Sequence, residues 1–483
     1  MNRQIRRLGV VIALLFLALF VNLNYLQVVR AHALAHDPRN GRIAFKSFSR
    51  QRGVIQTADG VVIAQSVKSD DQFKFLRQYP EGPLFGQVSG FFSFTFGDEG
   101  VESTYNDELT AHRPTKLTNL RQLITAGDRV SNVTLTLTKK VQQAAATALG
   151  NRKGAVVAID PKTGALLALW SFPSYDPNVL SSHDTQAVRT AHDTLTKDPA
   201  NPMLPRTFRE RYPPGSTFKV VTSSAVFDRA PELIAKPYPP LTALPLPQTK
   251  GQKLANFGNE LCGGTLPDLL KVSCNTGFAQ IGLDLGGDRL APEAKAFGFT
   301  TKPPLDMPAV AASVFPAASA FVHDLPGLAK SAIGQQDVQA TPLEMALVAA
   351  GIANSGVIMK PHVMAEIRDD QGNVITSYKP DTWMQATSPQ TAASVRDLMV
   401  GVVQGGTGTR VAIPGINVAA KTGTAQTVGN NAHAWMIAFA PAEAPRVAVA
   451  VIVESQPGLG DNATGGLVAA PVAKAVLQAA LSP

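Results

Sequence analysis

The chain has 483 residues, of which 45% are hydrophobic and 17% charged. This composition excludes a disordered chain and predicts about two or three domains with cores of their own. The formal net charge is +8, but the 44 basic residues are scattered among 36 acidic ones. Because the sequence has no dense Lys/Arg stripe with interleaved aromatic residues, we exclude a nucleic-acid partner and expect an anionic membrane or envelope surface.

Residues 1–30 predict a cytoplasmic tip and a transmembrane anchor. Arginines within the first seven residues precede an apolar run over 8–21, which continues to Val29 with three polar interruptions. About 22 residues at roughly 1.5 Å rise each suffice to cross a bilayer core, with the arginines on the cytoplasmic side. The alternative is a cleaved signal peptide, because the uninterrupted run has only 14 residues and Ala31–Ala35 offers small residues for cleavage. Both interpretations export the rest of the chain.

Residues 31–153 form the next predicted unit, an irregular α+β module. In "GVIQTADGVVIAQS", Asp59 and Gly60 separate two apolar runs, as in a β-hairpin. The pattern changes at "GAVVAIDPKTGALLALW", residues 154–170, where two strand-like runs flank a strong turn sequence. We therefore place the boundary of the main domain, 154–483, just before Gly154.

The end of the chain has a similar strand pattern and then a helix. "AWMIAFAP" and "RVAVAVIVES" predict two buried strands around a proline-containing loop, and Val468–Leu481 has the small apolar face of a closing helix. Strands at both ends of this domain, with helical patterns between them, predict one α/β sandwich. Its sheet would combine segments that are far apart in the sequence.

The middle of the domain contains a candidate nucleophile in "RERYPPGSTFKVV", residues 209–221. The Pro-Pro-Gly break places Ser216 at or next to the start of a helix, and Lys219 then lies on the same face. Side chains at i and i+3 are neighbours, so the amine could take the hydroxyl proton. The alternative is an ordinary N-cap, because serine is common at helix starts and Ser-x-x-Lys pairs arise by chance.

Two later motifs favour the catalytic interpretation. "SCN" places Ser273 and Asn275 fifty-four and fifty-six residues beyond Lys219, and "AAKTGTAQ" contains Lys421–Thr424. Taken singly, Ser-x-Asn is usually a turn and Lys-Thr-Gly is usually a loop. In this order the three motifs form the set typical of penicillin-binding proteins and serine β-lactamases.

The sequence resembles the class B penicillin-binding proteins over nearly the whole chain after the anchor. Besides the three motifs, the resemblance includes "GVESTYNDEL", "KGAVVAIDPKTGALLALWSFPSYDPN", "AIGQQDVQATPLEMALVAAGIANSG" and "HAWMIAFAP". Within this family the chain is most similar to the short penicillin-binding protein A type of actinobacteria. The resemblance implies the α/β (α+β) penicillin-binding and serine β-lactamase-like transpeptidase fold, a central antiparallel sheet flanked by helices. The N-terminal module would be non-catalytic, of a pedestal or dimerisation kind.

The resemblance also implies a serine-type D,D-transpeptidase that crosslinks peptidoglycan stem peptides and is acylated by β-lactams. Ser216 would be the nucleophile and Lys219 its base, Ser273 would relay a proton, and Asn275 would hold Lys219 and the substrate amide. The substrate carboxylate would be bound by Lys421, Thr422, Gly423 and Thr424. The alternatives are a D,D-carboxypeptidase, a β-lactamase-like hydrolase or sensor, and a non-catalytic division scaffold.

Nothing in the sequence requires a cofactor or a metal, and the histidines lack metal-ligand spacing. The front module is too short for a glycosyltransferase, so glycan polymerisation would fall to an envelope partner. We expect structural roles for His433, and a solvated or capping role for Glu344. Cys262 and Cys274 are the only cysteines in an exported domain, which favours a disulfide between them over two unpaired thiols.

Overall fold

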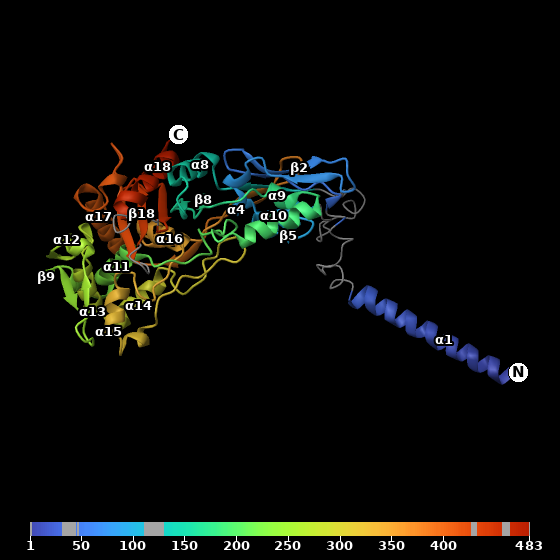
Figure 1. The fold of residues 1–483 in the computed structure, drawn as a ribbon, viewed down its shortest axis with the longest axis horizontal. Helices are drawn as coiled ribbons and strands as arrows, with labels where there is room; N and C mark the ends of the chain where they lie inside the picture. Colours follow the sequence, from blue (N-terminus) through green and yellow to red (C-terminus); the bar gives the residue numbers. More distant parts are fainter. Residues whose placement is uncertain are drawn as a thin grey trace. The chain divides into compact units, whose positions relative to one another are not determined.

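The computed structural model describes residues 2–30, 45, 48–110, 130–426, 432–455 and 464–482 (Figure 1). Two compact units are present, residues 1–51 with 67–76, and residues 52–66 with 77–483. In the first unit the predicted anchor forms α1 (Asn2–Asn24) and a short π-helical turn, η1 (Tyr25–Val29). The stretch Arg3–Val28 is long and apolar enough to cross a membrane, with a mean hydropathy of 2.2. Ala31–Ala35, the alternative cleavage site, lies outside the described residues.

A six-stranded sheet of the order β15-β14-β6-β1-β2-β3 combines strands from distant parts of the chain. The predicted hairpin around Asp59 and Gly60 is confirmed, because β1 and β2 pair antiparallel with Ile55 opposite Ala64. The strands are β1 (Ile55–Gln56), β2 (Val62–Lys68), β3 (Phe75–Gln78), β6 (Asn132–Leu135), β14 (Met364–Arg368) and β15 (Val374–Ser377). Since β14 pairs with β6, the segment assigned to the front module shares a sheet with residues beyond 360. The boundary before Gly154 stays a prediction.

The second sheet is five-stranded and wholly antiparallel, in the order β17-β18-β19-β7-β8. Its strands are β7 (Gly154–Ile159), β8 (Leu166–Phe172), β17 (Ala419–Gln426), β18 (Ala432–Ala440) and β19 (Val447–Val453). All four strands predicted from the two ends of the domain are confirmed. Every residue of β7 and β19 is buried, as expected of strands covered on both faces.

Helices cover both faces of this sheet (Figure 1). On one face α8 (Lys139–Leu149) and α18 (Ala470–Leu481) share an apolar cluster with the sheet, and α18 confirms the predicted closing helix. On the other face lies α16 (Pro342–Ala353), which Thr341 caps by accepting the Glu344 N–H at 3.1 Å. The expectation for Glu344 is wrong, because its side chain is fully buried within this helix. Burial raises the pKa of the Glu344 carboxyl to about 8.

The other elements surround the two sheets. Further helices are α4 (Gly86–Ser89), α5 (Val101–Thr104), α6 (Asn106–Leu109), α9 (Asn178–Ser181), α10 (Thr185–Lys197), α11 (Lys219–Arg229), α12 (Leu266–Lys271), α13 (Asn275–Leu285), α14 (Gly287–Ala296), α15 (Leu325–Ser331) and α17 (Pro389–Gly405). Short strand pairs are β4 (Phe92–Ser93) with β5 (Gly97–Asp98), β9 (Tyr238–Leu241) with β12 (Cys262–Gly264), β10 (Ala243–Pro245) with β11 (Lys253–Ala255), and β13 (Val357–Met359) with β16 (Thr382–Gln385).

Candidate active site

Ser216 lies in a single 3-10 turn, η3 (Gly215–Phe218), that continues directly into α11. Neither helix start has a side-chain cap, so Ser216 is not the ordinary N-cap of the alternative interpretation. Gly215 adopts a left-handed φ of 54°, and a Cβ on it would lie 2.9 Å from the carbonyl oxygen of Thr424. A glycine is therefore required here by both conformation and space. It brings the Ser216 turn against strand β17.

The segment before Ser216 is fixed by partners that the sequence analysis missed. The Trp435 indole N–H donates to the Pro213 carbonyl at 3.0 Å, and the Tyr212 hydroxyl donates to Glu454 at 2.8 Å. Glu454 also pairs with the fully buried Arg206 at 3.0 Å. No local pattern could indicate these contacts, because Glu454 follows β19, more than 240 residues from Tyr212 in the chain.

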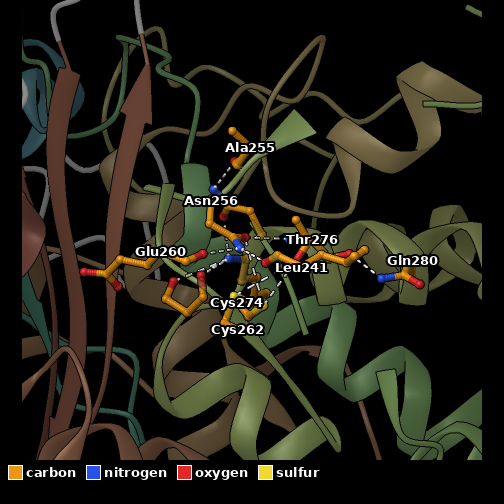
Figure 2. The surroundings of a disulfide bond; sticks show 11 residues. Leu241, Ala255, Asn256, Glu260, Cys262, Cys274, Thr276 and Gln280 are labelled. Carbon is orange, nitrogen blue, oxygen red and sulfur yellow. Dashed lines mark hydrogen bonds between the residues drawn. A yellow bond between two sulfur atoms is a disulfide. The ribbon is translucent and has the colours of Figure 1, made fainter. Parts of the chain in front are cut away.

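The second motif follows α12 and ends at Asn275, the first residue of α13, and the disulfide Cys262–Cys274 holds it to β12 (Figure 2). This bond confirms the predicted pairing. Asn256 adds a second support, because its side chain accepts the Thr276 N–H at 2.9 Å and donates to the Glu260 carbonyl at 2.8 Å. Ser273 itself has a left-handed φ of 62°, a conformation that is costly for a non-glycine residue.

Lys219 reaches both polar residues of this motif. Its Nζ donates to the Ser273 carbonyl at 2.7 Å and to Asn275 Oδ1 at 2.8 Å, and lies 3.4 Å from Ser273 Oγ. The side chain is fully buried. Burial first, and then the nearby charge of Lys421, lower the pKa of Lys219 well below its usual value. Both effects disfavour the charged amine relative to the neutral amine, which can accept a proton.

Lys421 approaches the same serine from strand β17. Its Nζ donates to Ser273 Oγ at 2.8 Å and to the Thr422 carbonyl at 2.9 Å. The side chain is fully buried, which lowers the pKa of Lys421 to about 7. Gly423 is required by packing, because a Cβ there would lie 2.9 Å from carbon atoms of Thr217 and Trp435. The sequence did not predict a strand for this motif, because Lys-Thr-Gly taken singly is usually a loop.

One cleft of about 900 Å³ contains the exposed parts of all three motifs. Its lining includes Ser216, Ser273, Asn275, Thr422 and Thr424. The two buried lysines contact this lining through Ser273 and Asn275. The hydroxyl of Ser216 makes no hydrogen bond with any residue that the structure describes, and catalytic hydrogen bonds are often long or absent without substrate. The arrangement suits acyl transfer by a serine with a neutral lysine as base.

Comparison with known families agrees with the fold and with the chemistry of this site. The model of the penicillin-binding protein transpeptidase domain matches residues 154–478, and that of the penicillin-binding protein A dimerisation domain matches residues 52–133. The chain belongs to the penicillin-binding protein transpeptidases. It is a serine acyltransferase by this membership, and the expected family and fold are confirmed.

Particular relatives are similar along the whole chain. Peptidoglycan D,D-transpeptidase PbpA of Mycolicibacterium smegmatis is 41% identical over 100% of this chain and 99% of its own length. The PbpA of Mycobacterium tuberculosis is 39% identical over the same shares. Penicillin-binding protein A from M. tuberculosis, solved as a ceftriaxone acyl-enzyme complex, matches with a TM-score of 0.84 and 38% identity over 91% of this chain and 100% of its own. Its penicillin G acyl-enzyme complex matches with a TM-score of 0.80 and 37% identity over 90% and 100%.

Proposed function

We propose that the protein is a peptidoglycan D,D-transpeptidase that crosslinks stem peptides ending in D-Ala-D-Ala and is acylated by β-lactams. The observation that carries the proposal is the convergence of Lys219 and Lys421 on Ser273, in the cleft that Ser216 lines. The M. tuberculosis and M. smegmatis relatives support the same activity by name.

In the first half of the proposed reaction, Ser216 Oγ attacks the carbonyl carbon of the penultimate D-Ala. Neutral Lys219 takes the hydroxyl proton, and the backbone N–H groups of Ser216 and Thr424 stabilise the oxyanion. The closeness of the Gly215 turn to the Thr424 backbone supports that pairing of donors. The carbon–nitrogen bond then breaks, Ser273 relays the proton from Lys219 to the leaving amine, and an ester to Ser216 remains.

In the second half, the amine of a neighbouring stem attacks the ester carbonyl. A new amide bond forms, the carbon–oxygen bond to Ser216 breaks, and the amine's surplus proton returns through Lys219 to the serine oxygen.

Asn275 holds Lys219 in place and faces the substrate amide. Thr422, Thr424 and cationic Lys421 bind the carboxylate of the terminal D-Ala, with a charge and hydroxyl donors directed at one anion.

A donor peptide with and without an acceptor amine tests this activity. The full chain in detergent, incubated with a D-Ala-D-Ala peptide, should release D-Ala, and the acceptor should convert most acyl-enzyme into an amide-linked dimer detectable by mass spectrometry. Exclusive release of hydrolysed donor at saturating acceptor would instead identify a carboxypeptidase. Failure to release any D-Ala would overturn the proposal.

We further propose that α1 anchors the protein in the cell membrane with the catalytic cleft outside the cytoplasm, where a glycosyltransferase partner supplies glycan strands. The apolar stretch Arg3–Val28 supports the anchor. Protease added to intact cells with a permeabilised outer envelope should digest the catalytic domain but spare a tag placed before Met1. Protection of the domain, or its recovery as a soluble product lacking α1, would contradict this arrangement.

A further inference from the structure

Charged side chains on the cleft wall outside the three motifs are mainly cationic. Among the described residues that line the cleft, these are Lys253, Lys330 and Arg410, with Glu260 as the single carboxylate. Arg410 differs from the two lysines in its location. It lies on η7 (Thr409–Val411) and lines the cleft together with Thr407, Thr422 and Thr424.

The backbone that carries Arg410 is joined by a hydrogen bond to the proposed carboxylate site. Thr407 Oγ1 lies 2.6 Å from Thr422 Oγ1 in a hydroxyl–hydroxyl hydrogen bond, and the Thr407 N–H donates to the Lys271 carbonyl at 3.2 Å. Val411 is fully buried, and its N–H donates to Gly408 at 3.1 Å. The turn is therefore fixed at both ends, with Thr407 joining it to β17.

The side chain of Arg410 is exposed in the cleft. It makes no ion pair or hydrogen bond with the residues that the structure describes. A guanidinium stays charged at all physiological pH values and presents donors that match a carboxylate. Among the described residues, this exposed cation of the cleft lining is unpaired and is therefore available to an anionic ligand in the cleft.

The chemistry of the proposed function identifies that ligand. Acylation and aminolysis are the same reaction in opposite directions, so the incoming amine must occupy the position that the D-Ala amine has left. The D-Ala carboxylate, which is on the carbon bearing that amine, leaves an anion site empty at the same time. An acceptor with a carboxylate on its amine-bearing carbon would fill it, whereas an acceptor without one would leave the cations unpaired.

We propose that Arg410 is a specificity-determining residue for the acyl acceptor, favouring an amine whose own carbon carries a carboxylate. This inference rests on the proposed transpeptidase function. It adds that the leaving-group side of the cleft selects the acceptor by charge.

The test compares two acceptors on one acyl-enzyme. The full chain is acylated with a D-alanyl thioester donor in the presence of equal concentrations of D-alanine and D-alaninamide, and the two amide products are quantified by mass spectrometry. Because both acceptors share one acyl-enzyme, their product ratio does not depend on the acylation rate. The different basicity of the two amines cancels when a variant is compared with the natural chain.

Arg410→Gln should lower the ratio of D-alanine product to D-alaninamide product about three- to tenfold, as expected for one partly solvated ion pair. Arg410→Lys should keep most of the ratio, because the charge remains. Arg189→Gln, which removes an exposed arginine on α10 outside the cleft, is the matched control and should leave the ratio unchanged.

An unchanged ratio in Arg410→Gln, or an equal loss of both products, would overturn the role of Arg410 while leaving the transpeptidase proposal intact. Absence of any acyl-enzyme in the natural chain would overturn both. A fall in the ratio with Arg410→Lys as large as that with Arg410→Gln would contradict recognition by charge.

Discussion

The two buried lysines have different surroundings, and their substitution should separate two functions. Lys219 contacts the Ser273 carbonyl and Asn275, whereas Lys421 contacts the Ser273 hydroxyl and lies next to Thr422. Lys219→Ala removes the base, so it should slow acylation by benzylpenicillin and by its methyl ester alike, by about 10²- to 10⁴-fold. Lys421→Ala removes a carboxylate partner, so the penalty should be at least about tenfold larger for the acid than for the ester.

Acylation rate constants for the two ligands, from time courses of intact-protein mass, provide the measurement. An equal penalty for acid and ester in Lys421→Ala would count against its role as the carboxylate partner. Thermal unfolding of each variant serves as the control for loss of the fold, because both lysines are buried.

The buried Glu344 carboxyl predicts how the stability of the folded protein depends on pH. Its pKa rises from 4.5 to about 8 in the folded protein because burial disfavours the charged form. Between pH 4.5 and pH 8 the folded state therefore keeps a proton that the unfolded state loses. The contribution of this proton to the free energy of unfolding is complete below pH 4.5 and decreases as the pH rises to 8. The slope is at most about 1.4 kcal/mol per pH unit for a single group.

Glu344→Gln removes this titration, so the variant should gain stability relative to the natural chain between pH 5 and pH 8. The measurement is the difference in Tm between the two proteins across that range. Asp337→Asn, at an exposed site in the neighbouring segment, is the control and should show no such trend. A constant Tm difference for Glu344→Gln would mean that the carboxyl is not held protonated.

At the scale of elements, the loop that carries Ser273 depends on the Cys262–Cys274 bond. Ser273 has a left-handed φ and is flanked by Cys274, so the bond and the Asn256 contacts hold a strained turn in place. In the chain-entropy model a loop of this size contributes roughly 3 kcal/mol. Reduction should therefore slow penicillin acylation under conditions in which the domain is still folded.

Acylation with and without reductant, followed together with near-ultraviolet circular dichroism, tests this prediction. The Cys262→Ser, Cys274→Ser double variant should acylate slowly in both conditions and show no response to reductant. An acylation rate that does not change on reduction, with the two free thiols verified by alkylation, would show that the bond does not support the motif.

Elements with strong local patterns could be predicted from the sequence, and elements defined by distant partners could not. Strands β7, β8, β18 and β19 follow from continuous apolar runs bounded by turn residues, and α18 follows from its apolar face. Strand β17 was not assigned, because "AAKTGTAQ" has small and polar residues whose extended form depends on pairing with β18.

The candidate site shows the same division at the level of single side chains. Ser216, Lys219, Ser273, Asn275 and Lys421 stand in short motifs, so they could be selected before their contacts were known. Glu454 and Arg206 could not, because their importance comes from contacts across roughly 250 residues of chain. The burial of Glu344 could not be predicted for a related reason, since a carboxylate is ordinarily exposed unless paired.

At the scale of the whole molecule, the active site is assembled from three segments that one antiparallel sheet and its helices bring together. Strand β17 supplies the Lys-Thr-Gly motif, η3 and α11 supply Ser216 and Lys219, and the turn before α13 supplies Ser273. Strands β14 and β15 belong to the six-stranded sheet. We infer that this assembly activates Ser216.

The most direct test of that claim is the mass of the full chain after reaction with benzylpenicillin, followed by peptide mapping. We predict the addition of one penicillin, located on Ser216, and no addition in Ser216→Ala, whose fold should remain because this hydroxyl makes no capping bond. Ser394→Ala, which removes a partly buried serine on α17, should still be labelled. A penicillin adduct on any other residue, or one that persists in Ser216→Ala, would contradict the account.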